Sequence, residues 1–294
     1  QEVGYWPYGY NSFYFDITKQ LMPGKKNTLA VRLENLPESS RWYPGAGLYR
    51  NVHVIVTENA HIPVWGTYVT TPTATKEFAK VNVRTQIVLL EGADAGKYSV
   101  KTSVWNPNGQ KLTEQTIPLS QIKYNDNSLS QEFIIQTPTL WSPDMPALYS
   151  AETRLYEGDQ LKDIYTTPFG IRSIEIIPNK GFFLNGEKTV FKGVCNHHDL
   201  GPLGAAVNDA AIRRQIRILK DMGCNAIRTS HNMPAPELVR ACDEMGMMLM
   251  VESFDEWNKA KCANGYNLIF DEWVEKDPVN LVHHYRNNPS VVTW

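Results

Sequence analysis

Residues 226–257 decide the fold, and they read AIRTSHNMPAPELVRACDEMGMMLMVESFDEW. In this stretch a strand, a helix and a second strand follow one another. A helix is predicted from Pro236, a residue favoured in a first turn, to Gly246, a residue favoured just after a last turn. Residues 247–251 are then a continuous apolar run, as in a parallel strand that is buried on both faces. This order of elements predicts a parallel α/β unit.

The same alternation continues on both sides of this stretch. A strand is predicted at 190–194, a helix from the N-cap Asn208 to Gly223, a helix from Asp277 through Tyr285, and a further strand from Val291. A complete (β/α)₈ barrel needs about 250 residues, and the α/β pattern covers roughly half of that. Residues 174–294 are therefore predicted to be either half of a TIM barrel or a small open sheet, and the stop at the fourth strand favours the first half of a barrel.

Residues 61–173 change to the period of two that is typical of β-strands. Val81, Val83 and Thr85 fall on one face, and the pattern recurs around Val100 and Ala151 with turn signals between the runs. Strands spaced in this way predict an immunoglobulin-like β-sandwich.

Residues 1–60 also read as strands, at 14–17, 29–33 and 51–56, with a Gly- and aromatic-rich loop between the last two. We interpret them as the C-terminal part of a β-sandwich domain whose first strands are absent. Gln1 follows no signal peptide, and Trp294 comes directly after a strand-like run, so we expect a fragment cut at both ends.

Composition excludes several classes of protein. The 294 residues are 42% hydrophobic and 20% charged, which is a globular composition. A net charge of −2 argues against nucleic acid or an anionic membrane as the partner. No apolar run approaches the roughly 18 residues of a membrane span. Four widely spaced cysteines predict free, mostly buried thiols, not a disulfide framework.

Polar clusters follow three of the predicted parallel strands, at 196–199, 228–232 and 252–257. The carboxyl ends of parallel strands meet at one mouth, where α/β proteins place their working residues. The sequence therefore predicts an active site there. Its candidate residues are His197, His198, Asp199, Arg228, His231, Glu252, Asp255, Glu256 and Trp257.

Each cluster also has a purely structural interpretation. The histidines could hydrogen-bond a loop, and Arg228 could form a buried ion pair with Glu252. Asp255 and Glu256 could belong to a solvated loop face. Trp257 could be core packing, or it could be a platform on which a sugar stacks.

Other chemistries lack a motif. His197, His198, Asp199, His231 and Glu252 are residue types that zinc accepts, but no HExxH or CxxC spacing supports a metal site. No G-x-S-x-G elbow, Walker loop or G-x-G-x-x-G is present.

Several segments resemble signatures of the family two glycoside hydrolases, the group of β-galactosidases, β-glucuronidases and β-mannosidases. Residues 225–234, continued by 243–246, are similar to the first signature of the family, and residues 285–294 are similar to the start of the second. Residues 191–199 resemble the first barrel strand of the family. Residues 41–52 resemble the end of its sugar-binding jelly roll, and residues 140–143 resemble its middle domain. Within the group the chain looks most like β-galactosidases. The first signature departs from the usual His-Tyr-Pro, because it reads His231-Asn232-Met233-Pro234 here.

The resemblance implies a jelly-roll part at 1–60, an immunoglobulin-like sandwich at 61–173 and a TIM half barrel at 174–294. It implies a retaining exo-β-glycosidase that acts on terminal β-linked sugars. The acid/base glutamate of the family is expected just after Trp294 and the nucleophile further on, so this chain alone is predicted to be inactive.

The resemblance also implies roles for the candidate residues. The three histidines would bind sugar hydroxyls, Arg228 would orient the absent nucleophile, and the three carboxylates would support the site. Glu256 aligns with a Mg²⁺-ligand position of some galactosidases; no cofactor is required, although an intact enzyme could hold Mg²⁺ or Na⁺.

A rival hypothesis is a non-catalytic carbohydrate-binding protein, and a second one is a metal-dependent hydrolase. The expected partner is a β-galactoside or related glycan, with no nucleic acid and no membrane. A homo-oligomer of the intact enzyme is compatible with the sequence. The periplasm and the cytoplasm of a bacterium both stay open.

Overall fold

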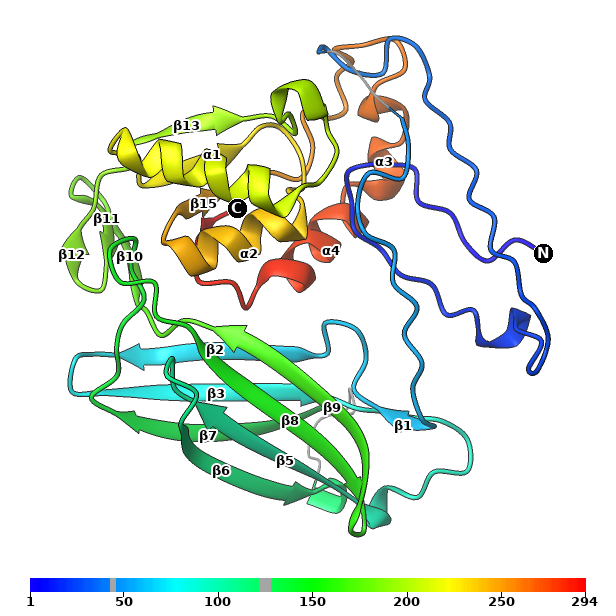
Figure 1. The fold of residues 1–294 in the computed structure, drawn as a ribbon, viewed down its shortest axis with the longest axis vertical. Coiled ribbons are helices and arrows are strands. Elements are labelled where there is room, and N and C mark those ends of the chain that lie inside the picture. The colour runs from blue at the N-terminus through cyan, green and yellow to red at the C-terminus, as the bar shows by residue number, and fades with distance from the viewer. Residues whose placement is uncertain (43–45, 122–127) are drawn as a thin grey trace.

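The computed structural model describes residues 1–42, 46–121 and 128–294. Figure 1 shows a β-sandwich at the bottom, helices and short parallel strands above it, and the N-terminal segment along one side of both. No helix within these described ranges is long and apolar enough to cross a membrane.

The sandwich consists of two antiparallel sheets, in the orders β2-β3-β7 and β6-β5-β8-β9 (Figure 1). Val81 and Val83 of β3 and Val100 of β5 are fully buried between the sheets, as the period-two pattern predicts. A short pair, β1 with β4, lies at one end. The strands are β1 (Ala60–His61), β2 (Thr67–Ala74), β3 (Phe78–Gln86), β4 (Val88–Leu89), β5 (Tyr98–Trp105), β6 (Lys111–Pro118), β7 (Ser128–Gln136), β8 (Tyr149–Glu157) and β9 (Gln160–Phe169).

After the sandwich, the chain forms a three-stranded antiparallel sheet in the order β10-β11-β12. Four further strands form a parallel sheet in the order β13-β14-β15-β16, and each is joined to the next through a helical connection. This is the alternation that the sequence predicts. The antiparallel strands are β10 (Ile174–Ile177), β11 (Gly181–Leu184) and β12 (Glu187–Lys188), and the parallel strands are β13 (Gly193–Asn196), β14 (Ala226–Thr229), β15 (Met248–Met250) and β16 (Val291–Thr293). The α-helices are α1 (Asp209–Asp221), α2 (Pro236–Met245), α3 (Phe270–Trp273) and α4 (Lys276–Tyr285).

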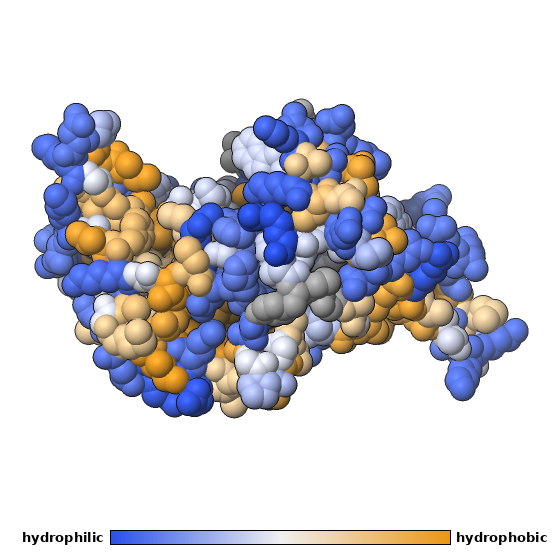
Figure 2. Space-filling view, turned by 90° about the horizontal axis from the view of Figure 1, so that it is seen from above, coloured by the Kyte–Doolittle hydropathy of each residue, from blue (hydrophilic) through white to orange (hydrophobic). Residues whose placement is uncertain are grey.

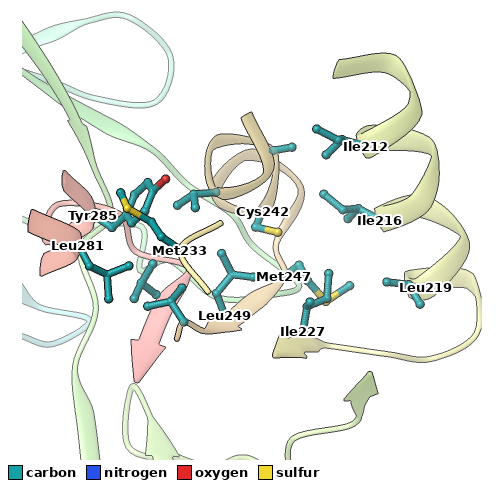
Figure 3. Close-up of a cluster of buried hydrophobic side chains, with 14 residues drawn as sticks. Ile212, Ile216, Leu219, Ile227, Met233, Cys242, Met247, Leu249, Leu281 and Tyr285 are labelled. Atoms are coloured by element: carbon teal, nitrogen blue, oxygen red, sulfur yellow. The ribbon is translucent and has the colours of Figure 1, made fainter. Parts of the chain in front are cut away.

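The predicted caps of the first two helices are confirmed. The Asn208 side chain accepts a hydrogen bond from the Ala211 amide at the start of α1, and Gly246 ends α2 in the left-handed conformation. Their apolar faces and the strands enclose one core, with Ile216 and Met247 fully buried (Figure 3).

Three strands predicted in residues 1–60 are wrong. Residues 14–17, 29–33 and 51–56 form no strand, and their apolar side chains are largely exposed, for example Val54 at 76% and Val56 at 90%. A strand needs a neighbour to pair its backbone groups, and no described segment pairs with these. Figure 2 shows hydrophobic residues interspersed with hydrophilic ones on the surface seen from above. The jelly-roll assignment of this segment, like the three domain boundaries, stays a prediction.

The N-terminal segment docks on α4 through polar contacts. Asp277, fully buried, accepts hydrogen bonds from the Trp6 indole at 2.9 Å, from the Asn11 amide at 2.5 Å and from the Tyr266 hydroxyl at 2.5 Å. The Asn280 amide donates to the Ser12 carbonyl at 2.6 Å.

The cysteines are free, but the expectation that most are buried is wrong. Only Cys242 is buried; Cys195 is exposed, and Cys224 and Cys262 are partly exposed. Cys195 lies on β13, an edge strand of the four-stranded sheet.

The sandwich and the parallel sheet meet at a buried carboxylate, Asp243 of α2. Its oxygens accept hydrogen bonds from the Ser290 amide at 2.9 Å and the Asn288 side chain at 2.5 Å, and its carbonyl accepts one from the Trp141 indole at 2.9 Å. Burial raises the pKa of Asp243 to about 6, although these hydrogen bonds oppose the shift.

This raised pKa predicts a pH dependence of stability. Between about pH 4 and pH 6 the native state holds a proton on Asp243 that the unfolded state has released, so the stability contribution of this group falls as pH rises. The measurement is urea unfolding of wild type and Asp243→Asn from pH 4 to 7. The difference between their free energies of unfolding, wild type minus variant, should fall as pH rises, by up to roughly 3 kcal/mol. Asp221→Asn, at an exposed carboxylate, is the control. Parallel curves for wild type and Asp243→Asn would contradict the prediction.

Candidate active site

The carboxyl ends of β14 and β15 place three predicted residues in direct contact. One oxygen of Glu252 accepts a hydrogen bond from Arg228 Nε, and the other lies 2.8 Å from His231 Nδ1. Glu252 and His231 each have about a fifth of their side chain exposed, at 20% and 22%. The carboxylate therefore holds a cationic and an imidazole group side by side at the mouth of the sheet.

The ion-pair interpretation of Arg228 is confirmed, but the pair is not buried, because 42% of the Arg228 side chain is exposed. Its Nη1 lies 3.7 Å from Cys195 Sγ on the neighbouring strand. Arg228 is thus anchored on one side and open to the mouth on the other.

Asp255 connects this group to the N-terminal segment. Arg41 donates to both Asp255 oxygens, from Nε at 2.9 Å and Nη2 at 2.7 Å, and Lys261 Nζ lies 3.4 Å from Oδ1. His231 Nε2 lies 4.0 Å from the same oxygen. Burial acts to raise the pKa of Asp255, but the Arg41 guanidinium outweighs it and holds that pKa below its ordinary value.

The solvated-loop interpretation is wrong for both acidic residues of this loop. The Asp255 side chain is only 13% exposed, and Glu256 is 4% exposed. Glu256 accepts a hydrogen bond from the Lys261 amide, and a Cβ on Gly265 would lie 1.7 Å from its other oxygen. A side chain at 265 would therefore displace this carboxylate, and glycine lets the loop close over it.

The described residues of this chain form no metal site by themselves. In the described part of the chain, no group of three or more His, Cys, Asp or Glu side chains is arranged to hold a metal ion. Glu256 is a single carboxylate that already accepts a backbone hydrogen bond. Its assignment as a metal ligand stays a prediction.

The two adjacent histidines after β13 have different surroundings. His198 Nε2 is hydrogen-bonded to Asn232 Oδ1, and its ring lies 5.0 Å from the Tyr10 ring. Burial lowers the pKa of His198 to about 3, so the ring is neutral. His198 thus joins loops, as one structural interpretation has it. His197 is exposed, with its ring 5.5 Å from that of His231.

The described contacts of Asp199 and Trp257 are with other residues. Asp199 accepts a hydrogen bond from the Gly201 amide at 2.8 Å within its own loop. Trp257 is 67% exposed and faces Phe254 and Phe270, so the core-packing interpretation is wrong. Its role as a sugar platform stays a prediction.

Two residues of the mouth escaped the sequence analysis. Trp42 lies 4.9 Å from the His197 ring and 6.1 Å from the His231 ring, and Arg41 binds Asp255. Both belong to the Gly- and aromatic-rich loop that the sequence analysis placed in a separate domain; residues 43–45 of that loop lie outside the described residues. The signal that could have indicated these two site residues is the adjacent Arg-Trp pair in a loop.

The arrangement can bind a polyol. It offers an aromatic face, imidazole and guanidinium donors and carboxylate acceptors around one opening, which are the groups that hydrogen-bond hydroxyls and stack on a pyranose. Within the contacts described, the groups brought together are Arg41, Trp42, His197, Arg228, His231, Glu252 and Asp255.

Comparison with known proteins gives matches over most of the chain. Residues 60–172 match the family model "Glycosyl hydrolases family 2", and residues 175–294 match "Glycosyl hydrolases family 2, TIM barrel domain". Among curated proteins, the chain is 43% identical to the beta-galactosidase BoGH2A of Bacteroides ovatus and 37% identical to a putative beta-glucuronidase of Formosa agariphila, in both cases over 99% of the chain. It covers only 34% and 27% of these relatives, so it spans about a third of their length.

Solved structures agree in fold. A glycosyl hydrolase family 2 member from Bacteroides cellulosilyticus superposes with a TM-score of 0.94 at 37% identity, over 99% of this chain and 38% of that one. A beta-glycosidase from Bacteroides vulgatus superposes with a TM-score of 0.87 at 34% identity, over 99% and 37% of the respective chains. The predicted sandwich followed by the start of a TIM barrel is thereby confirmed.

Proposed function

The chain belongs to glycosyl hydrolase family 2, and from this premise we propose that it forms part of a retaining exo-β-glycosidase that acts on β-galactosides. Membership of this β-glycosidase family supports hydrolysis of a glycosidic bond. The observation that carries the proposal is Glu252, whose two oxygens engage Arg228 and His231 at the mouth of the parallel sheet.

In the proposed mechanism, this chain supplies binding and orientation. A retaining glycosidase places an acid/base and a nucleophile about 5–5.5 Å apart across an oxocarbenium-like transition state. We assign neither role to a residue of this chain. Arg228, held by Glu252, would orient the nucleophilic carboxylate, and His197 and His231 would hydrogen-bond sugar hydroxyls. The Trp42 ring, beside both histidines, would pack on the sugar face.

The substrate sugar is proposed from the relatives of the chain. Arg228 is paired with Glu252, while Arg41 and Lys261 share Asp255, so these three cations face two carboxylates and leave one positive charge in excess. Of the two curated proteins named above, the one with the higher identity, 43%, is a beta-galactosidase, which supports galactose as the substrate sugar.

The first test compares substrates and chain lengths. We expect no turnover of a 4-nitrophenyl β-galactoside by the 294-residue chain, because we assign neither reacting carboxylate to it. We expect the whole enzyme to hydrolyse the β-galactoside with a higher kcat/KM than the β-glucuronide or the β-mannoside. A faster glucuronide reaction would overturn the substrate assignment. A whole protein that binds galactose and hydrolyses none of the three would favour a non-catalytic carbohydrate-binding protein.

A further inference from the structure

A second polar cleft lies away from the mouth, where the sandwich meets the α4–β16 loop. It has a volume of about 180 Å³ and is lined by β2, by the connection from β9 to β10 and by residues 286–289. Two arginines line it, Arg172 from the sandwich side and Arg286 from the end of α4. No acidic residue is among its lining residues.

Neither arginine has a carboxylate partner in the described part of the structure. Arg286 donates from Nη2 to the carbonyls of Trp65 at 2.9 Å and Thr67 at 3.4 Å, and its guanidinium lies 4.8 Å from the centre of the Tyr68 ring. Its Nε is buried and has no hydrogen-bond partner. A partly buried guanidinium without a carboxylate partner is costly, so an anion in the cleft would be stabilising.

Arg172 is in a similar position. It is partly buried, and its one described hydrogen bond runs from Nη2 to the Val291 carbonyl at 2.7 Å. Burial lowers the pKa of Arg172 to about 10, which reflects a guanidinium kept from water. The nearby Asp243 does not neutralise it by contact, because its oxygens are taken by Ser290 and Asn288.

We propose that this cleft binds a small oxyanion, a phosphate group or the carboxylate of a small organic acid, between Arg172 and Arg286. Guanidinium groups match the planar or tetrahedral oxygens of such anions by paired hydrogen bonds. A single water occupies about 10–15 Å³ by the same measure, so the cleft is large enough for an anion of several atoms. The anion would link the sandwich to the barrel part, because each domain contributes one arginine.

Phosphate also stabilises proteins without binding at a site, so a rise in melting temperature would not demonstrate binding. Binding is therefore measured directly, by ³¹P NMR line broadening at constant ionic strength. We expect the ³¹P resonance of millimolar inorganic phosphate to broaden when wild-type protein is added. We expect Arg286→Gln to weaken phosphate binding about tenfold or more. Arg217→Gln, at an exposed arginine of α1, should bind like wild type.

A second variant keeps the test decisive if Arg286→Gln fails to fold. Thr70 lines the cleft and lies on the same face of β2 as Tyr68, because side chains alternate along a strand. Thr70→Glu would place a carboxylate beside the arginines, so we expect it to abolish phosphate broadening without lowering the melting temperature. Acetate that displaces the phosphate signal would identify a general oxyanion site, and acetate that does not would restrict it to phosphate.

The proposal is overturned if wild type does not broaden the phosphate resonance. It is also overturned if wild type, Thr70→Glu and Arg217→Gln broaden it equally, because binding would then be to scattered surface cations. Neither outcome affects the glycosidase proposal, which depends on the other end of the strands.

Discussion

In the whole enzyme, Glu252→Ala is expected to lower kcat/KM for an aryl β-galactoside by about 10²–10³-fold. The substitution removes a carboxylate that accepts from Arg228 on one oxygen and contacts His231 at 2.8 Å on the other. Hydrogen bonds to charged groups are worth about 1.5–3 kcal/mol each, so two of them correspond to about 10²–10⁴-fold, and the lower part of this range is expected because the site is partly exposed. Arg228 would also lose the partner that fixes its direction.

Graded variants separate charge from geometry. Glu252→Gln keeps an oxygen acceptor but no charge, so we expect a smaller loss, about tenfold. Glu244→Gln is the matched control, because Glu244 pairs with Arg213 on the outer surface of the helices and a surface pair contributes little. Equal activity of Glu252→Ala and Glu244→Gln, with both proteins folded, would show that the Arg228–Glu252–His231 group does not serve the sugar site.

The barrel part is the region that the sequence predicts well. The helices α1 and α2 and the strand β14 follow from local signals: a capping Asn208, a Pro236 in the first turn, a Gly246 at the end and an apolar periodicity between them. The contact of Arg228 with Glu252 also follows, because parallel strands place their carboxyl ends together.

The N-terminal segment shows what local patterns leave out. Its period-two runs, such as 29–33, have strand character, yet a strand forms only where another backbone pairs with it, and that partner is not encoded in the run itself. The contact of Arg41 with Asp255 spans 214 positions of sequence, so no spacing rule could place it. The burial that keeps His198 neutral depends in the same way on Tyr10 from the far end of the chain.

The largest loss of stability is expected from Trp141→Ala, at the junction of the two domains. Trp141 is fully buried, and it belongs to a cluster with Phe182 and Met248. Large-to-small substitutions of buried aromatic residues cost about 3–5 kcal/mol. The Asp243 carbonyl would also lose its hydrogen bond from the indole, which adds about 1–3 kcal/mol.

Such a loss is a large part of a typical stability of about 5–15 kcal/mol, so the variant should unfold at a much lower urea concentration, measured by far-UV circular dichroism. Trp141→Phe keeps most of the buried ring but removes the N–H donor, so it should show the smaller, hydrogen-bond part of the loss. Trp257→Ala, at a ring that is 67% exposed, should change the free energy of unfolding by no more than about 0.5 kcal/mol. If Trp141→Ala and Trp257→Ala unfold at the same urea concentration, then the sandwich is not anchored to the barrel through Trp141.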